Sequence, residues 1–450
     1  MINIAPIRTN IFGRMLSVRN GSPKLRYWKK LESTQFLPLI ELQKIQLQRL
    51  LEMWSFLWRQ NPFYRKRFIK YGLTENSLKN PEDIHKLPIL TKKEVRKAAD
   101  GMLSSGYKKS LLQHFKTGGS TGKALDIYIT EACSELRNAC AWRHDRWTGW
   151  EPGEPIGAAW GNPKLPRTVK EKLINKLIQP YIYFDTMAVT DNAVKRFAAE
   201  WKNIQPTLLF GHSHSLYILA RMVRRLGIDH IRPVGIISTS MMLLPNERTF
   251  IEQVFHVPVT DRYGCEEVSL IGCECEHHDG MHMNIEHLII EFIKEDGSIA
   301  TAGEPGQIVV TDLMNKAMPF IRYKVEDIGV PLDRKCSCGR GLPLMKNVVG
   351  RVADFLVKKD GTRVAGVSLI ENTLTKWPGI DQMQIIQETI DAIHIKIVPG
   401  GSYSDEVRFN LIDYFKRLFD ADTHIQIEVI NEIMPERSGK FRFSICKVDR

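Results

Sequence analysis

Short apolar runs alternate with amphipathic helical segments through the middle of the chain, and this alternation is the feature that most restricts the fold. Four segments are expected to be helical, and short apolar runs that suit buried strands lie between them. Strands that alternate with helices form sheets that are at least partly parallel. The pattern therefore predicts an α/β body with mixed or parallel sheets. The expected helices are Glu131 to Trp147, Thr190 to Asn203, Ser213 to Leu226 and Asn246 to Phe255, and the expected strands are Ile156 to Ala159, Thr207 to Phe210, Val234 to Ser238 and Val257 to Thr260.

A different pattern begins near residue 350 and predicts a second, smaller domain. Phe355–Lys358 and Thr362–Val364 flank Lys359-Asp360-Gly361, which is a hairpin signal. Further strand-like segments surround an expected helix from Ser404 to Phe419. A length of 450 residues leaves room for one large domain and one small one. We expect a body at residues 1–350 and a mobile α+β lid at residues 351–450.

Composition excludes several classes of protein. Hydrophobic residues make up 43% of the chain, which is enough for a sizeable core and argues against disorder. The net charge of +12 is spread along the sequence, so we expect no nucleic-acid partner. No apolar run approaches the roughly 20 residues needed to span a bilayer. These observations favour a cytoplasmic protein without a membrane span.

A loop rich in glycine and hydroxyl groups is the first candidate binding site. Thr117-Gly118-Gly119-Ser120-Thr121-Gly122-Lys123 combines a flexible backbone, exposed N–H groups and a cation, which suits a phosphate chain. The P-loop pattern does not fit, because Ala124 follows the lysine and Thr117 stands where a glycine is required. A flexible hairpin tip remains the alternative, although it does not explain Lys123.

A second candidate lies near the carboxyl end of the chain. Met434-Pro435-Glu436-Arg437-Ser438-Gly439-Lys440 forms a proline-started loop that presents a lysine to a phosphate or a carboxylate. Taken alone, this segment reads as a basic tail. Together with the loop that ends at Lys123, it favours a nucleotide site.

These motifs and their order resemble the acyl-adenylate-forming superfamily, and within it the phenylacetate–coenzyme A ligase branch, which includes ligase-like proteins of capsular-polysaccharide clusters. The similarity covers nearly the whole chain. Asp261-Arg262-Tyr263-Gly264-Cys265-Glu266-Glu267 resembles the family's Tyr-Gly-x-x-Glu motif, and Ile321-Arg322-Tyr323-Lys324-Val325-Glu326-Asp327 its aspartate motif. Gly350-Arg351 is similar to the residues beside the family's hinge, which would here span Arg351 to Asp354.

The resemblance implies a role for each matched residue. Tyr263 and Gly264 would lie against adenine, Glu267 would help to hold Mg²⁺, and Asp327 would grip the ribose hydroxyls. Arg351 would border the nucleotide, and Lys440 would be the catalytic lysine of adenylation; Glu267 would be the second catalytic residue, through the Mg²⁺ held near it. The residues that would grip the triphosphate are Thr117, Gly119, Ser120, Thr121, Gly122 and Lys123.

The implied reaction is the ATP-dependent activation of a carboxylic acid to acyl-AMP, followed by transfer to coenzyme A. An aryl or arylacetic acid is the favoured substrate. Two alternatives stay open: transfer to an amine in polysaccharide or secondary-metabolite biosynthesis, and nucleotide binding without catalysis. The implied cofactors are ATP or AMP, Mg²⁺ and coenzyme A, and a dimer is an oligomeric state that the sequence leaves open.

Several residues depart from the family's pattern and bear on turnover. Glu326 stands where glycine is frequent, and Met241-Met242 stands where many relatives have Gly-Glu. Ala353 occupies the usual position of the hinge aspartate, with Asp354 beside it. The fold does not depend on these positions, but the geometry of nucleotide binding does.

A cluster of cysteine and histidine predicts a structural zinc site. Thiolate and imidazole are the usual ligands of structural zinc, which binds four of them in a tetrahedron. We expect Cys275, His282, Cys336 and Cys338 to be the ligands, an arrangement similar to one in part of this branch. Cys273, His277 and His278 are competing ligands, and unpaired thiols with exposed histidines are the alternative.

Overall fold

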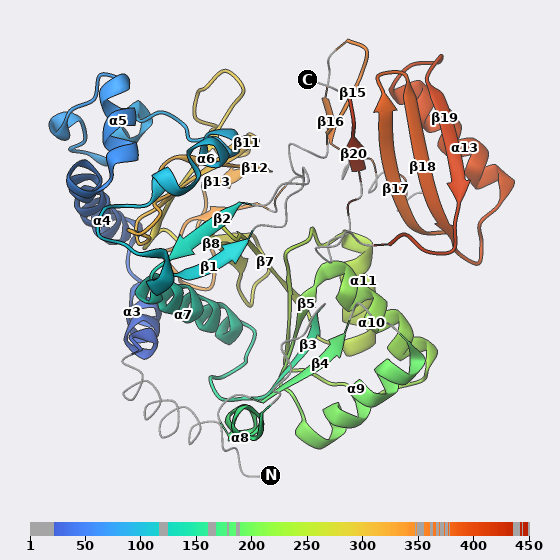
Figure 1. Cartoon of the computed structure of the whole chain (residues 1–450). Coiled ribbons are helices and arrows are strands. Elements are labelled where there is room, and N and C mark those ends of the chain that lie inside the picture. The colour runs from blue at the N-terminus through green and yellow to red at the C-terminus, as the bar shows by residue number, and fades with distance from the viewer. Residues whose placement is uncertain are drawn as a thin grey trace. The chain divides into compact units, whose positions relative to one another are not determined.

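The computed structural model describes most of the chain (Figure 1). The described residues are 22–116, 125–160, 168–177, 180–185, 190–346, 348, 355–360, 363–365, 369, 373, 377, 379–434, 442 and 444–448. The predicted phosphate loop from Thr117 to Lys123, the hinge at Arg351 and the loop with Lys440 lie outside these residues. The residues form two compact units: Met1–Ser240 with Phe250–Val325 and Gly329–Asn347, and Met241–Thr249 with Glu326–Ile328 and Val348–Arg450.

Helices at the amino-terminal side begin the first unit. They are α3 (Lys24–Thr34), α4 (Leu39–Gln60) and α5 (Pro62–Lys70). Asn61 separates α4 from α5, because its side chain accepts a hydrogen bond from the Tyr64 backbone N–H at 2.9 Å and Pro62 starts the new helix. Short helices follow: η2 (Glu75–Ser77), η3 (Pro81–Lys86), α6 (Lys92–Ala98), η4 (Ala99–Met102) and η5 (Lys109–Leu111).

A nine-stranded sheet forms the centre of the first unit. Its order is β13-β14-β9-β8-β7-β6-β5-β3-β4, and the five strands β4, β3, β5, β6 and β7 run parallel. The parallel strands are β3 (Ile156–Trp160), β4 (Tyr181–Asp185), β5 (Leu208–His212), β6 (Gly235–Thr239) and β7 (Val259–Cys265). The antiparallel side has β8 (Ser269–Glu274), β9 (Met281–Met283), β13 (Pro331–Leu332) and β14 (Leu344–Met345). The mixed α/β fold expected from the sequence is confirmed.

The helices between the strands are α7 (Glu131–Trp147), α8 (Val169–Leu177), α9 (Asp191–Ile204), α10 (Ser213–Arg225) and α11 (Pro245–Phe255). Figure 1 shows α9 and α10 beside the parallel strands, and α10 packs on β3, β5 and β6. Threonines fix two of the starts: the Thr130 hydroxyl accepts from the Cys133 N–H at α7, and the Thr190 hydroxyl accepts from the Ala193 N–H at α9.

The direction in which successive parallel strands are added to the sheet reverses at β3. From β3 the chain adds β4 on one side, then crosses back to place β5 on the other side of β3. In open α/β sheets, ligands bind beyond the carboxyl ends of the strands at such a switch point. The carboxyl ends of β3 and β5 are therefore a place to look for a ligand site.

Two smaller sheets complete the first unit. β1 (Gln113–Lys116) and β2 (Asp126–Ile129) form an antiparallel pair, so the predicted phosphate loop connects these two strands. A three-stranded sheet has the order β10 (Leu288–Ile293), β11 (Gly306–Asp312) and β12 (Tyr323–Gly329). None of the helices in the described part of the chain has the length and apolar character needed to cross a membrane.

The second unit contains a four-stranded sheet with a helix. The sheet order is β19 (His424–Val429), β18 (Ala392–Pro399), β17 (Ile380–Thr389) and β20 (Ser444–Cys446), and α13 (Asp405–Leu418) packs against β19. Ile385, Ile395, Leu411 and Phe415 belong to its apolar core. A hairpin of β15 (Phe355–Val357) and β16 (Arg363–Ala365) lies where the Lys359-Asp360-Gly361 turn predicted one.

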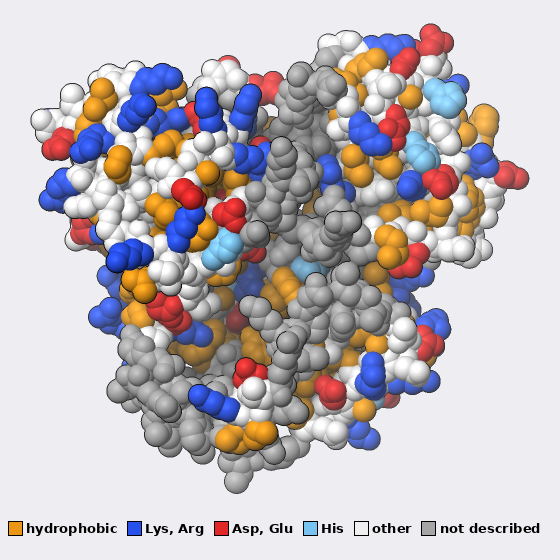
Figure 2. All heavy atoms as spheres, in the orientation of Figure 1, with side chains coloured by type: hydrophobic (Ala, Val, Ile, Leu, Met, Phe, Trp, Pro, Cys, Tyr) orange, Lys and Arg blue, Asp and Glu red, His pale blue; other side chains and the backbone are white. Residues whose placement is uncertain are grey.

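Lysine and arginine side chains are dispersed on the face drawn in Figure 2, where they alternate with aspartate and glutamate among the described residues. Dispersed charge of this kind is typical of a solvated surface.

Candidate active site and metal cluster

The turn between β7 and β8 carries three of the predicted site residues. Tyr263 and Gly264 are near the end of β7, where the register with β8 shifts by a bulge. A Cβ atom on Gly264 would lie 2.4 Å from the Ser269 carbonyl oxygen, so the close approach of the two strands requires glycine here. Glu267 follows in the turn.

Glu267 is buried at 6% exposure, and its carboxylate has a partner on another strand. The Tyr323 hydroxyl, from the start of β12, donates a hydrogen bond to Glu267 Oε1 at 2.8 Å. Tyr323 is itself almost fully buried. This contact joins the two sequence motifs that were identified separately, one around Tyr263 and one around Asp327.

Arg137, in the middle of α7, holds the backbone of the same turn. Its guanidinium donates to the Glu266 carbonyl at 3.2 Å and to the Glu267 carbonyl at 2.8 Å. It also pairs with the Asp312 carboxylate at 3.2 Å. Asp312 in turn accepts from the Met314 N–H at 2.8 Å. A single buried cation therefore ties α7 and the end of β11 to the turn.

Arg322 anchors the start of β12. Its guanidinium bonds both carboxylate oxygens of Glu291, at 3.0 and 2.8 Å, and donates to the carbonyls of His85 and Leu87. Arg322 has φ +48, which few side chains adopt without such support. Farther along β12, Asp327 is buried at 3% exposure, and Glu326 before it has φ +74. This left-handed conformation gives a physical reason for glycine being frequent at the position of Glu326.

Aromatic rings lie at the carboxyl ends of β3 and β5, at the switch point of the sheet. The Trp160 ring is stacked with Phe210 at 5.2 Å between centroids and lies 3.8 Å from the His212 ring. The Arg262 guanidinium is 5.1 Å from the centre of the Phe210 ring and pairs with Asp145 at 2.8 Å. The sequence did not single out Trp160, although an aromatic residue at the end of an apolar run was the available signal.

The structure brings together the four residues that the sequence predicted as metal ligands. One ligand atom from each of Cys275, His282, Cys336 and Cys338 lies within 4.8 Å of the others. The Cys275 and Cys336 sulfurs are 3.6 Å apart, and Cys338 Sγ is 3.3 Å from His282 Nε2. Cys275 follows β8, His282 is in the middle of β9, and the other two cysteines lie between β13 and β14.

The surroundings of the cluster suit a metal. His282 Nδ1 contacts the Leu342 carbonyl at 3.2 Å, which orients Nε2 toward the cysteines. Burial lowers the pKa of His282 to about 4, so the imidazole is neutral, as a metal ligand must be. Burial raises the pKa of Cys338, but hydrogen bonds from Arg340 outweigh burial and lower it overall. The Arg340 backbone N–H lies 3.4 Å from Cys338 Sγ.

The competing ligands have other partners. His277 Nδ1 lies 3.0 Å from the Ser337 hydroxyl, and His278 Nδ1 lies 3.3 Å from Glu274. Cys273 is buried on β8 outside the group, and among the described residues no second group of this kind occurs.

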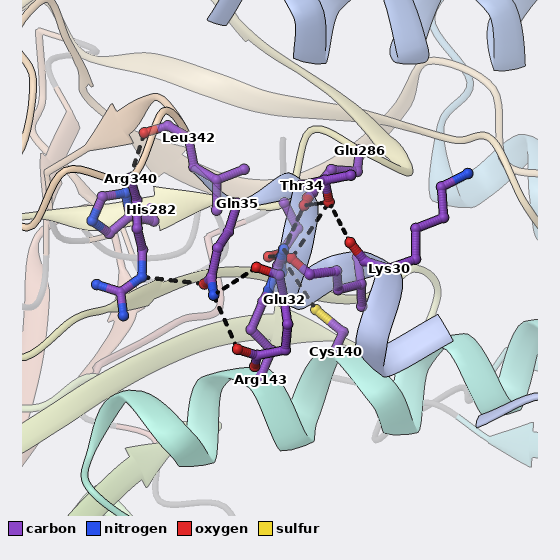
Figure 3. A network of polar contacts seen from close by, with 12 residues as sticks. Lys30, Glu32, Thr34, Gln35, Cys140, Arg143, His282, Glu286, Arg340 and Leu342 are labelled. Carbon is purple, nitrogen blue, oxygen red and sulfur yellow. Dashed lines mark hydrogen bonds and ion pairs between the residues drawn. The ribbon is translucent and has the colours of Figure 1, made fainter. Parts of the chain in front are cut away.

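Figure 3 shows how Arg340 extends the cluster toward the amino-terminal helices. Its Nε donates to Gln35 Oε1 at 3.2 Å, and the Trp147 indole donates to the same oxygen at 2.9 Å. Beside them, the fully buried Arg143 pairs with Glu286 and donates to Asn284 Oδ1 at 2.7 Å. The hydroxyl of Thr34, the last residue of α3, also donates to Glu286 at 3.1 Å, so Asn284 and Glu286 are bonded to α7 and α3.

Known proteins resemble the chain along most of its length. Protein CapK of Staphylococcus aureus is 24% identical over 420 residues, which cover 91% of this chain and 90% of CapK. The phenylacetate–coenzyme A ligase of Thermus thermophilus is 23% identical over 405 residues, covering 85% of this chain and 86% of the ligase. Residues 356–447 match the family described as the CapK C-terminal domain. The chain is therefore similar in sequence to CapK and to the phenylacetate–coenzyme A ligases.

The fold of the chain matches that of adenylate-forming ligases. A crystal structure of 2-hydroxyisobutyryl-CoA ligase in the postadenylation state superposes with a TM-score of 0.74 at 18% identity, covering 92% of this chain and 91% of the ligase. The same ligase with 2-HIB-AMP and CoA in the thioesterification state superposes with a TM-score of 0.62. The resemblance inferred from the motifs is therefore confirmed, and it covers both units.

Three residues at the candidate site were not predicted from the sequence. Arg137, Tyr323 and Trp160 reach it from α7, β12 and β3, which are far apart in the chain. Tyr323 lies in the same sequence motif as Asp327, but the resemblance to the family implied a role only for Asp327.

Proposed function

We propose that the protein activates a carboxylic acid with ATP to form acyl-AMP and then transfers the acyl group to coenzyme A. The observation that carries this proposal is the match of phenylacetate–coenzyme A ligases along most of the chain, at 23–25% identity. Joined to it are a fold typical of such ligases and a buried Glu267 beside Tyr263 and Gly264.

The chemistry requires positive charge in a defined place. The acid's carboxylate attacks the α-phosphorus of ATP, and pyrophosphate leaves. Because both reactants are anionic, cationic groups must stabilise the developing charge. Lys440 is the proposed side chain that bridges the carboxylate and the α-phosphate, and Lys123 with the hydroxyls of the Thr117–Lys123 loop would grip the departing phosphates. Mg²⁺, when bound near Glu267, would neutralise phosphate charge.

We propose an aryl or arylacetic acid as the substrate. The paired rings of Trp160 and Phe210 support this choice, because flat apolar surfaces attract aromatic groups. Their place at the switch point of the parallel sheet also supports it, since ligands of α/β sheets bind there.

We further propose that Cys275, His282, Cys336 and Cys338 hold a structural Zn²⁺. Three thiols and one imidazole form a closed set of four ligands, which leaves no open position for chemistry. The ion would cross-link β9 to the β13–β14 loop, and the boundary between body and lid would lie near residue 350. The hinge would span Arg351 to Asp354.

The function is tested by incubating the full chain with ATP, Mg²⁺, a panel of acids and coenzyme A, and analysing products by mass spectrometry. We expect AMP and an acyl-CoA thioester with an aryl or arylacetic acid. Replacing Lys440 with alanine should slow acyl-AMP formation about 10²–10³-fold without unfolding the chain. An unchanged rate in that variant would remove Lys440 from the mechanism.

The acceptor is tested in the same experiment. If acyl-AMP persists in the presence of coenzyme A but is consumed when amines are added, the acceptor is an amine and not a thiol. The proposed activation step would stand in that case.

A further inference from the structure

The turn that carries Glu267 is held from two directions by side chains that no sequence motif had assigned to it. We propose that Tyr323 and Arg137 are positioning residues that fix the Glu267 carboxylate for the Mg²⁺ of the bound nucleotide. This inference rests on the proposed function, since it concerns the same site. Neither residue is expected to touch the reacting atoms.

Tyr323 sets the direction of the carboxylate. Its hydroxyl donates to Glu267 Oε1 at 2.8 Å. A carboxylate has about four lone-pair positions, so one such bond leaves acceptor positions for a cation. Mg²⁺ favours carboxylate oxygens and demands a strict geometry, which a freely rotating glutamate would not provide.

The Tyr323 side chain is itself fixed by its strand. The Leu90 N–H donates to the Arg322 carbonyl at 2.8 Å, and the Lys324 N–H donates to the Leu90 carbonyl at 3.0 Å. The ring packs edge-on against Phe320 at 5.1 Å between centroids. The buried Arg322–Glu291 pair anchors the residue before it. The hydroxyl is therefore presented from a rigid strand.

Arg137 fixes the other end of Glu267. Its bonds to the Glu266 and Glu267 carbonyls hold the backbone from which the side chain extends. The Asp312 carboxylate orients the guanidinium, and this pair is nearly buried. With the carbonyl held by Arg137 and one carboxylate oxygen held by Tyr323, few rotamers of Glu267 remain.

The magnitude of the effect follows from other metal sites. Removing a side chain that orients a metal ligand costs about 10–100-fold in metal affinity or activity. Replacing Tyr323 with phenylalanine removes only the hydroxyl and keeps the ring, so the packing on Phe320 stays. We expect a loss of Mg²⁺ affinity, while the contacts between the protein and the rest of the nucleotide stay unchanged.

The test is calorimetric titration of ATP into the full chain, without acid, at a series of Mg²⁺ concentrations. Mg²⁺ is expected to increase the affinity for ATP, and the Mg²⁺ concentration at half of this increase is the quantity compared. For Tyr323→Phe we expect this concentration to rise about 10-fold or more, with ATP affinity in EDTA unchanged. Arg137→Ala should raise this Mg²⁺ concentration similarly. Arg137→Lys keeps a positive charge and should raise it less than Arg137→Ala does. Glu267→Gln gives the limit in which Mg²⁺ dependence is largely lost.

Tyr64→Phe is the matched control. Tyr64 is equally buried, and its hydroxyl bonds the Pro319 carbonyl and the Ile321 N–H without reaching Glu267. This variant should keep wild-type Mg²⁺ dependence. The inference is overturned if Tyr323→Phe behaves as wild type, if Tyr64→Phe shifts equally, or if ATP affinity in EDTA falls as much as with Mg²⁺. A wild-type chain that binds no ATP at any Mg²⁺ concentration would instead defeat the proposed function.

Discussion

Buried ionisable side chains determine much of the local structure around the candidate site. Burial, the largest cause, lowers the pKa of His287 to about 3, and the nearby Arg49 and Arg143 lower it further while Glu286 opposes them. His287 is thus neutral in the folded chain across the physiological range, beside a tightly paired Arg143 and Glu286. Protonating it would require a second positive charge in the same buried space.

This residue makes stability depend on pH in a defined direction. Between pH 6.5 and about 3 the unfolded chain binds a proton at His287 that the folded chain does not, so stability falls as the pH is lowered through this range. The contribution is at most about 1.4 kcal/mol per pH unit. Urea titrations of wild type and His287→Phe from pH 7 to pH 4 measure it. We expect a shallower loss in the variant.

His424→Phe, at an exposed position on β19, controls for the loss of a histidine as such. Parallel pH curves for wild type and His287→Phe would contradict the burial of a neutral imidazole.

The metal cluster is tested at the same scale. Cys338→Ser should reduce bound zinc from one per chain to well below one, since Zn²⁺ prefers a full set of soft ligands. A loss of about 2 kcal/mol would lower the melting temperature by roughly 2–3 °C in a unit of this size. Cys446 lies on β20, outside the cluster, so Cys446→Ser should leave the zinc content and the melting temperature unchanged. Elemental analysis that finds no zinc in the wild type would refute the site.

At the scale of elements, local signals predicted some structure well. Helix α7 begins and ends where expected, and the Thr130 side chain caps its start. The break between α4 and α5 also arises from local signals, because Asn61 caps α5 and Pro62 begins it. Strand β4 was missed, and α3 was missed because lysine and arginine interrupt its apolar face.

What the sequence did not provide are contacts between distant elements. The resemblance to part of the phenylacetate–coenzyme A ligase branch selected Cys275, His282, Cys336 and Cys338 from a wider set of cysteines and histidines, and the fold places these four together. No local signal links Tyr323 to Glu267 or Arg137 to Asp312, because those pairs depend on how β12 and α7 pack. The resemblance to a family gave the motif residues their roles, and packing alone identified their neighbours.

The aromatic residues at the ends of β3 and β5 yield a prediction about substrate choice. Trp160→Ala removes the ring that covers Phe210 and His212. Aromatic pairing contributes about 0.5–1.5 kcal/mol, so KM for an aryl acid should rise about 2–12-fold. A short aliphatic acid should be affected less.

Phe36→Ala is the control, since that ring is 54% exposed. Steady-state kinetics with a matched pair of acids measures the effect. An equal change for both acids would show that Trp160 does not select an aromatic group.

At the scale of the whole molecule, the proposed reaction requires residues from both units. Glu267 belongs to the first unit, whereas Lys440 belongs to the segment Val348–Arg450 of the second. Residues 356–447, which match the CapK C-terminal domain, make up most of the segment Val348–Arg450 of the second unit.

The central claim is that this chain activates a carboxylic acid as its adenylate. The most direct measurement is ATP–pyrophosphate exchange by the purified full chain, with Mg²⁺ and without coenzyme A, across a panel of aryl, arylacetic and aliphatic acids. We expect ATP–pyrophosphate exchange that depends on the acid and is fastest with an aromatic acid. ATP binding without exchange for any acid would contradict it and indicate a nucleotide-binding protein without this catalysis.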